Sequence, residues 1–223
     1  MRHQPAAAAR ERLSPEIRVA ATLILLFLMA QPSDQWTFHH FIFRGINERP
    51  WGRMLRLAGY LPLWGIVALA LVLHDWVPRK LSTLRRASRR GLLLFWSAAL
   101  AGIIAELFKI AFHRVRPGPT NGAHVFRSWS EQPFSTAQLG LPSSEVAVAF
   151  GGATILARLF PDAWLLWYVL AAGCGFTRVA SGAHFMSDVI LAALLGYVST
   201  VILWRRRGLA GTQVTASPGD ANA

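Results

Sequence analysis

Cysteine, lysine and acidic residues are all scarce in this chain of 223 residues. Its one cysteine, Cys174, excludes an intrachain disulfide and a cysteine metal cluster. Charged residues make up only 15% of the sequence, below the roughly 25% of a soluble domain. Since hydrophobic residues reach 53%, the composition excludes a disordered chain and argues against an ordinary soluble globule.

Basic residues outnumber acidic ones by 23 to 11, which gives a net charge of +12. Only two of the basic residues are lysines, Lys80 and Lys109. A basic excess suits either nucleic acid or an anionic membrane surface, and here the basic residues cluster between apolar runs. The sequence therefore predicts membrane lipids as partners and no nucleic acid.

Long apolar runs dominate the rest of the chain. Six spans of about 20 residues would use roughly 120 residues, and 53% of 223 is about 118. The pattern predicts an all-α, polytopic membrane protein with six transmembrane helices in one bundle, in which Gly151 and Gly152 allow close helix packing. The predicted spans cover residues 19–33, 57–73, 91–112, 142–160, 163–179 and 184–204.

The segments outside the spans are short. Residues 1–18 and 205–223 are predicted to be cytoplasmic tails, the second of them disordered, on either side of a membrane domain at 19–204. The first span resembles a signal-peptide core, but no convincing cleavage site follows it, which favours a retained span. Residues 35–56 mix aromatic and basic side chains, which suits either a segment in the membrane interface or a simple connector.

Lysine and arginine set the predicted orientation. With both ends inside, the inner segments carry more of them than the outer segments, as cytoplasmic loops do. Both termini are therefore predicted to be cytoplasmic. The arginine bias and the compact build favour a bacterial inner membrane.

Ionisable residues gather at the span ends that this orientation places outside, facing the periplasm or exterior. Ionisable residues near membrane spans are expensive and become functional candidates by default. Two groups lie at the end of the third span and around the start of the sixth: Lys109, His113, Arg114, Arg116, Arg178, His184 and Asp188.

The sequence spacing of these residues predicts which of their side chains lie close together. Lys109 and Arg116 are seven residues apart and share a face if the helix continues. His184 and Asp188 are four apart, so the carboxylate can hold one imidazole nitrogen and leave the other free. Three cations beside such a histidine suit a phosphate, because phosphoryl transfer depends on positioning and charge stabilisation.

These residues resemble the signatures of a known family. Lys109-x6-Arg116-Pro117 is similar to the first signature of the type 2 phosphatidic acid phosphatase family, and Arg178-x5-His184-x3-Asp188 is similar to the third. Each pattern is expected by chance only about 0.01 to 0.02 times in a chain of this composition. The resemblance covers about residues 90–204 by motif.

The resemblance implies a mechanism. His184 would attack phosphorus and form a phosphohistidine, and Asp188 would orient it. The phosphoryl oxygens would be bound by Lys109, Arg116 and Arg178, and no metal or other cofactor would be needed. The sequence itself shows no set of His, Asp and Glu with metal-ligand spacing.

The second signature departs from the family pattern. The family has Pro-Ser-Gly-His, whose serine and amides bind phosphate and whose histidine protonates the leaving oxygen. This chain has Pro142-Ser143-Ser144-Glu145, and Thr177 replaces the usual serine that opens the third signature. We expect Ser143 and Ser144 to contact phosphate at a helix N-terminus, although they could simply cap the helix.

Glu145 leaves four alternatives open. It could be the general acid, which requires a protonated carboxyl, although nearby cations and a helix N-terminus favour the carboxylate. His113 or His124 could take that role. A pyrophosphate substrate would need little protonation of its leaving phosphate. Finally, hydrolysis could be lost, with only phospholipid binding retained.

Three neighbouring residues receive simpler interpretations. Arg114 and Arg127 are expected to be solvated and are left out of the site. Glu106 lies one turn before Lys109 and is expected to pair with it.

The expected function is therefore hydrolysis of a phosphate or pyrophosphate head group on a lipid, through His184, at the outer face of the membrane. By resemblance, the substrate candidates are polyprenyl pyrophosphate, lipid A phosphate, phosphatidylglycerophosphate and phosphatidate. A phosphotransferase, a hydrolytically silent lipid-phosphate binder and a small transporter are the alternatives.

Overall fold

The computed structural model describes the backbone of residues 14–43, 45–75 and 80–206, and the side chains of these residues except 75 and 80–88. Most of both predicted tails, residues 1–13 and 207–223, lies outside the described residues. Within the described part the secondary structure is helical, with two isolated antiparallel bridges and no strand. The helices are α1 (Pro15–Ala30), η1 (Gln31–Ser33), α2 (Asp34–Phe41), α3 (Pro50–Leu57), α4 (Leu61–Asp75), α5 (Lys80–Phe112), α6 (Ser144–Leu159), η2 (Pro161–Ala163), α7 (Trp164–Ala180) and α8 (Met186–Arg206).

The helix starts follow local chemistry. α1 begins after Ser14, whose hydroxyl accepts a hydrogen bond of 3.4 Å from the amide of Ile17. Pro15 and Glu16 open that helix, where a missing N–H does no harm and a negative charge is favoured. α3 likewise begins at a proline, Pro50. Short-range signals therefore explain these two boundaries.

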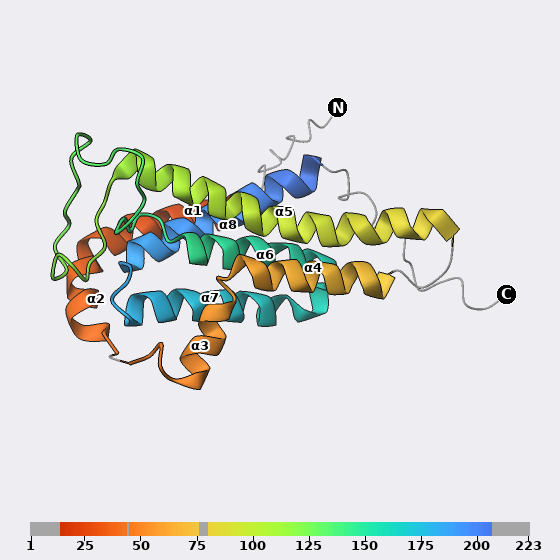
Figure 1. Cartoon of the computed structure of the whole chain (residues 1–223), viewed down its shortest axis with the longest axis horizontal. Coiled ribbons are helices and arrows are strands. Elements are labelled where there is room, and N and C mark those ends of the chain that lie inside the picture. Colours follow the sequence, from red (N-terminus) through yellow and green to blue (C-terminus); the bar gives the residue numbers. More distant parts are fainter. Residues whose placement is uncertain (1–13, 44, 76–79, 207–223) are drawn as a thin grey trace, which may run out of the picture.

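The long helices form one elongated bundle with α6 at its centre (Figure 1). α6 packs against α5, α7 and α8, while α4 lies mainly against α5 and α1 lies against α8. Ten residues of α6 are buried, from Val146 through Leu156 with Phe150 excepted. A helix that is apolar on nearly every side is suited to this interior position.

Glycines allow the central helices to approach closely. A Cβ on Gly151 would lie 2.8 Å from the carbonyl oxygen of Ser97, and a Cβ on Gly152 would lie 2.5 Å from the ring of Trp64. Across the α6–α8 contact, a Cβ on Gly196 would lie 2.6 Å from the carbonyl oxygen of Ala147. The predicted packing role of Gly151 and Gly152 is confirmed.

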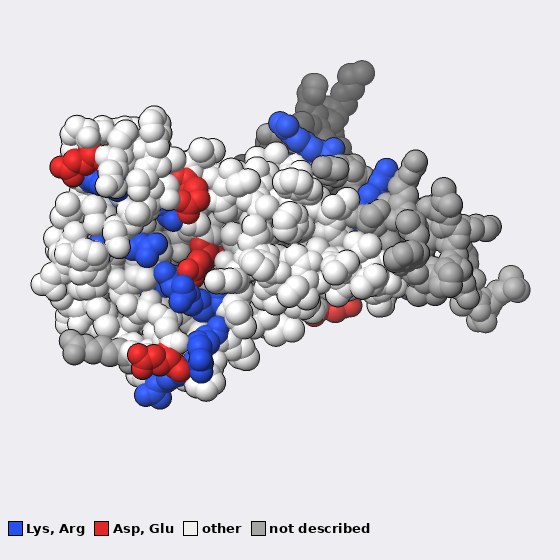
Figure 2. All heavy atoms as spheres, viewed as in Figure 1, with Lys and Arg blue, Asp and Glu red and all other residues white. Residues whose placement is uncertain are grey.

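The outward faces of the bundle are apolar. Large hydrophobic side chains such as Leu25, Ile66, Leu107 and Leu165 are more than half exposed. Figure 2 shows charged side chains gathered toward the two ends of the visible face, with a broad white surface between them. An apolar surface of this size suits the hydrocarbon of a membrane.

Length and composition support four membrane-crossing helices in the described part, or five if the bent pair α3 and α4, at 66°, forms one span. The predicted number of six is not confirmed, because α6 has only 16 residues, fewer than the about 20 of a typical span. Five of the predicted runs nevertheless begin and end within a few residues of observed helices, namely α1, α4, α6, α7 and α8. α5 differs most, since it begins at Lys80 rather than at residue 91.

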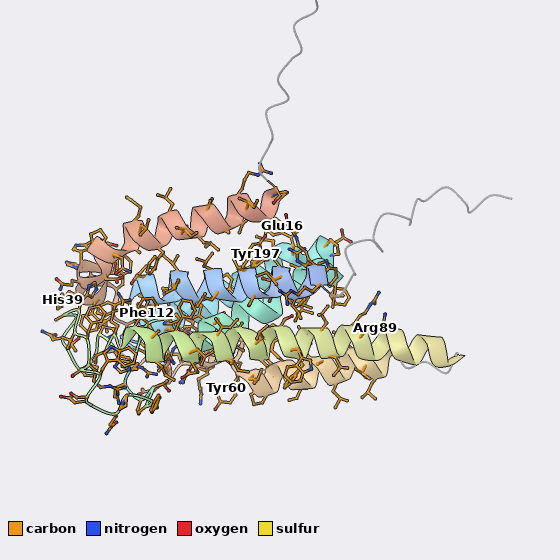
Figure 3. The ribbon with its side chains drawn as sticks, turned by 90° about the horizontal axis from the view of Figure 1, so that it is seen from above. Glu16, His39, Tyr60, Arg89, Phe112 and Tyr197 are labelled. Carbon is orange, nitrogen blue, oxygen red and sulfur yellow. The ribbon has the colours of Figure 1, made fainter. Side chains whose placement is uncertain are left out.

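The start of α1 and the end of α8 lie together. Glu16 forms ion pairs with Arg205 at 3.3 Å and with Arg158 at 3.9 Å. Figure 3 shows Glu16 at the end of the bundle opposite His39 and Phe112. α2 lies at that other end (Figure 1), and the described residues of the segment 35–56 form α2 and α3 rather than one continuous element.

The tight α6–α8 contact can be tested by Gly196→Ala. The added methyl group would meet backbone atoms of α6 at 2.6 and 2.9 Å, and overpacking of this kind costs about 1–3 kcal/mol. We expect the apparent melting temperature in detergent to fall by several degrees, measured by thermal unfolding. Gly65→Ala is the matched control, because its nearest neighbour would lie at 3.9 Å, and an equal fall in both variants would contradict the assignment.

Candidate active site

Four helix ends meet at one end of the bundle. The C-terminal ends of α5 and α7 and the N-terminal ends of α6 and α8 converge there, beneath the long loop 113–143 (green in Figure 1). Backbone hydrogen bonds tie this loop together, from Val115 to Val125 at 2.8 Å and from Gly140 to Arg114 at 2.8 Å. The loop therefore provides a fixed cover over the helix ends.

His184 lies in the turn between α7 and α8. Gly182 turns the chain with a φ of +68°, a conformation that favours glycine, and the amide of His184 then donates to the carbonyl of Arg178 at 3.2 Å. The imidazole is buried, with 3% exposure. Its Nδ1 lies 2.9 Å from the carbonyl oxygen of Gly140 and 3.5 Å from Oδ2 of Asp188.

This geometry decides which nitrogen is available. Nδ1 faces two oxygen acceptors, so it serves them as the N–H donor, and the lone pair then resides on Nε2. Burial lowers the pKa of His184 below its ordinary value, although Asp188 acts in the opposite direction. The ring is therefore neutral at pH 7 and presents an unprotonated nitrogen, as a nucleophile requires.

Asp188 is held from several sides. Its Oδ2 accepts a hydrogen bond of 2.9 Å from the amide of Phe185, and its Oδ1 pairs with the guanidinium of Arg114. Arg114 also donates to the hydroxyl of Ser187 at 2.7 Å and lies 3.6 Å from Oδ2 of Asp34. The Asp188 carboxylate can therefore move little.

Two members of this network were missed or misassigned by the sequence analysis. The prediction that Arg114 is solvated is wrong, because Arg114 has 1% exposure and lies between two buried carboxylates. Asp34, fully buried on α2, accepts hydrogen bonds from the amide and hydroxyl of Ser187. The only sequence signal for Asp34 is an acidic residue directly after an apolar run in a chain poor in acids.

The predicted phosphate-binding cations lie around the same helix ends. Lys109 on α5 and Arg178 on α7 are both 4% exposed. The charges of Arg116 and Arg178 both act on His184, and the charge of Arg116 also acts on Lys109. Nε of Arg116 donates to the carbonyl of Leu139 at 3.2 Å, which ties this cation to the loop.

Lys109 has two partners. Its ammonium donates to Glu106 at 2.7 Å and to the hydroxyl of Ser144, which also bonds to Glu106. The predicted pairing of Glu106 with Lys109 is confirmed. Ser144 therefore holds Lys109 at the start of α6.

Ser143 has a different environment. It occupies the N-cap position of α6, but its side chain makes no capping hydrogen bond. Its hydroxyl is buried and has no hydrogen-bond partner within the described part of the chain. A buried, unpartnered hydroxyl is rare in proteins and is consistent with a group that a ligand completes.

Glu145 is part of an ion pair that no motif or spacing in the sequence predicts. Its two carboxylate oxygens accept hydrogen bonds from Arg56 on α3, from Nη2 at 3.0 Å and from Nε at 3.1 Å. Nε of Arg178 lies 3.4 Å from Oε2. A carboxylate that faces two guanidinium groups is stabilised in its ionised form.

The two histidines considered as alternative acids are placed differently. His113 is buried in the loop, where its ring nitrogens lie 3.3 and 3.0 Å from the carbonyl oxygens of Arg127 and Pro133 and its ring stacks on Trp129. His124 is partly exposed, and its Nε2 lies 3.3 Å from Asp34. His113 therefore stabilises the loop, whereas His124 borders the Asp34–Arg114 network. Arg127 also belongs to the loop, because its guanidinium donates to the carbonyl groups of Gln132 and Ser135.

No group of three or more His, Cys, Asp or Glu residues within the described ranges has an arrangement that could hold a metal ion. The ionisable groups at the helix ends are basic residues, one oriented histidine, and carboxylates that are paired with cations. Such an arrangement is suited to binding an anion and to phosphoryl transfer through the histidine.

Comparison with known proteins identifies similar sequences. Two curated relatives, both named lipid A 1-phosphatase, come from Rhizobium johnstonii and Rhizobium etli. Each is 33% identical over 124 residues, which cover 53% of this chain and 50% and 52% of the relatives, respectively. The chain thus matches about half the length of these relatives.

One solved structure is also similar, the crystal structure of Aquifex aeolicus LpxE. The match has a TM-score of 0.45 and 20% identity, and it covers 73% of this chain and 92% of that structure. The model of the PAP2 superfamily matches residues 90–210, a region that contains α6, α7, α8 and most of α5. This match extends over more than half of the sequence, and the chain belongs to the PAP2 superfamily.

Proposed function

We propose that this protein is a membrane lipid phosphatase that removes a phosphate or pyrophosphate head group through His184. The observation that carries the proposal is the buried His184 ring, with Nδ1 directed at Gly140 and Asp188 and with basic residues around it. The relatives named lipid A 1-phosphatase support a lipid phosphate as substrate.

In the first step, Nε2 of His184 attacks phosphorus and the bond from phosphorus to the leaving oxygen breaks. Lys109, Arg116 and Arg178 bind the phosphoryl oxygens, and the hydroxyl of Ser143 donates to one of them. In the second step, water attacks the phosphohistidine, the P–N bond breaks and phosphate leaves. We propose that the reaction needs no metal, and every group in this scheme is accordingly a side chain or water.

The pairing of Glu145 bears on the leaving group. A carboxylate held by Arg56 would have to lose favourable contacts before it could carry a proton. We therefore propose that the leaving oxygen needs little protonation, as when phosphate leaves from a pyrophosphate. The same observation favours a second candidate, a hydrolytically silent lipid-phosphate binder.

An apolar cavity supports a lipid substrate. It has a volume of about 460 Å³ and is lined by apolar residues of α4, α6 and α7 that include Trp64, Leu156 and Trp167. Ala58, two residues after Arg56, is one of its lining residues. We propose that a lipid tail occupies this cavity while its head group reaches the charged cluster past Ala58.

We further propose six spans, with both termini cytoplasmic and the site facing the periplasm of a bacterial inner membrane. α3 and α4 would form one broken span, and α6 would bring the number of spans from five to six. Its 16 residues extend only about 24 Å, but neighbouring helices enclose it, so it needs little contact with lipid. The start of α1 and the end of α8 lie together, as an even number of spans requires.

The first test is phosphate release from four lipids by purified wild type and His184→Ala, in detergent with EDTA. The lipids are a polyprenyl pyrophosphate, a lipid A phosphate, phosphatidylglycerophosphate and phosphatidate. We expect release by the wild type alone, because the variant lacks the nucleophile, and the pyrophosphate should be the best substrate. Release by His184→Ala would exclude His184 as the nucleophile, whereas binding without release by the wild type would support the silent binder.

The pH profile tests the state of His184. Because burial lowers its pKa below the ordinary value of 6.5, the neutral ring persists as the pH falls through 6.5. We expect kcat/KM to decline only at lower pH. A phosphate monoester itself titrates at about pH 6, so the profile should be measured with two head groups of different pKa. If the rate falls with an apparent pKa at or above 6.5 for both head groups, the lowered pKa of His184 is contradicted.

The Asp34–Arg114–Asp188 network can be tested by Arg114→Met. This change leaves two buried carboxylates without their cation, a situation that costs about 3–5 kcal/mol. We expect a much lower apparent melting temperature and, where folded protein survives, loss of turnover through a misplaced Asp188. Adding Asp34→Asn should recover part of the stability, and no recovery would argue against electrostatic coupling of the pair.

A further inference from the structure

Arg56 is a half-buried partner of the site that neither the family signatures nor the comparisons identify. It lies on α3, outside the region matched by the superfamily model, and reaches Glu145 across 89 positions of sequence. Both of its contacts are short, at 3.0 and 3.1 Å, and each goes to a different carboxylate oxygen. This two-point geometry fixes the orientation of the Glu145 carboxylate.

Close packing places α3 for this contact. A Cβ on Gly59 would lie 2.7 Å from Cβ of Glu145, and a Cβ on Gly173 would lie 2.7 Å from the side chain of Leu55. The chain just after α3 therefore rests directly on the first turn of α6, while α3 itself rests on α7. Such contacts fix the position from which α3 presents Arg56.

Arg178 remains only partly engaged. Its Nε lies 3.4 Å from Glu145 and has no hydrogen-bond partner within the described residues, although the side chain is only 4% exposed. The hydroxyl of Ser143, two positions before Glu145, is buried and unpartnered as well. Unsatisfied donors of this kind in one place point to an anionic ligand with several oxygens.

We propose that Arg56 is a positioning residue that holds both oxygens of the Glu145 carboxylate, limits Glu145 to one longer contact with Arg178, and so leaves Arg178 available for phosphate. Without Arg56, Glu145 would pair fully with Arg178, the cation it already contacts at 3.4 Å, and compete with the phosphoryl group as an internal anion. Arg56 also neutralises the charge that would otherwise repel a phosphate dianion. The proposal deepens the function proposed above, because it concerns the phosphate affinity of the same site.

The test compares Arg56→Gln, Glu145→Gln and the double variant with the wild type. We expect Arg56→Gln to raise KM about tenfold, equivalent to 1.4 kcal/mol, with a much smaller change in kcat. The double variant should recover most of that loss, because the competing carboxylate is gone. Arg56→Lys should lie between Arg56→Gln and the wild type, since lysine keeps the charge but not the two-point contact.

Arg53→Gln is the matched control, because Arg53 is exposed on the same helix and should leave KM unchanged. If Arg56→Gln lowers kcat with KM unaltered, or if the double variant shows no recovery, the proposal is overturned. Should Arg56→Gln fail to fold, Glu145→Gln alone decides the matter. It should bind inorganic phosphate at least as tightly as the wild type, and weaker binding would count against competition by Glu145.

A binding measurement separates this proposal from the proposed hydrolysis. Inorganic phosphate should raise the apparent melting temperature of the wild type in detergent, and Arg56→Gln should need about tenfold more phosphate for the same shift. If that dependence appears while no lipid is hydrolysed, the phosphatase proposal fails and the role of Arg56 stands. If phosphate gives no shift in the wild type, the role of Arg56 is overturned.

Discussion

The rest of the site depends on the ion pairs of the buried Arg114 guanidinium. It pairs with Asp188 at the start of α8 and lies 3.6 Å from Asp34 on α2. Two carboxylates with no solvent access could not remain ionised and close together without a cation between them. The network therefore joins the N-terminal helices, the long loop and α8 at one point, and it holds the carboxylate that orients His184.

The bundle provides the second constraint. α6 reaches the centre because Gly151, Gly152 and Gly196 let backbones and rings approach where a Cβ would collide. With α6 in that position, Ser143 and Ser144 begin a helix directly beside the ends of α5 and α8. Close packing along the bundle thus determines where the proposed phosphate-binding groups lie at its end.

The charged groups of the site differ in their exposure to solvent. His184 and Asp188 are fully enclosed, whereas Glu145 and Arg56 keep side-chain exposures of 27% and 38%. The oriented histidine consequently has little contact with bulk water, while the pair at the second signature faces a more open region. This contrast is consistent with a reaction at His184 and with a carboxylate that influences binding more than proton transfer.

Local features of the fold and the site could be predicted from the sequence. Apolar runs predicted the long helices, because burial and lipid exposure both select such runs. The pairing of Lys109 with Glu106 and the proximity of His184 to Asp188 followed from helical spacing, which needs only neighbouring turns. The signatures around Lys109, Arg178 and His184 also indicated the family, since each occupies a short stretch of sequence.

Long-range pairings were decided by the tertiary structure alone. Arg114 reaches Asp188 across 74 positions, Ser187 reaches Asp34 across 153, and Arg56 reaches Glu145 across 89. No periodicity connects such residues, so the sequence could show Arg114 only as one more basic residue in a loop. Whether an ionisable side chain faces solvent or an opposite charge depends on which helix ends meet, and that is settled by the packing of whole helices rather than by local spacing.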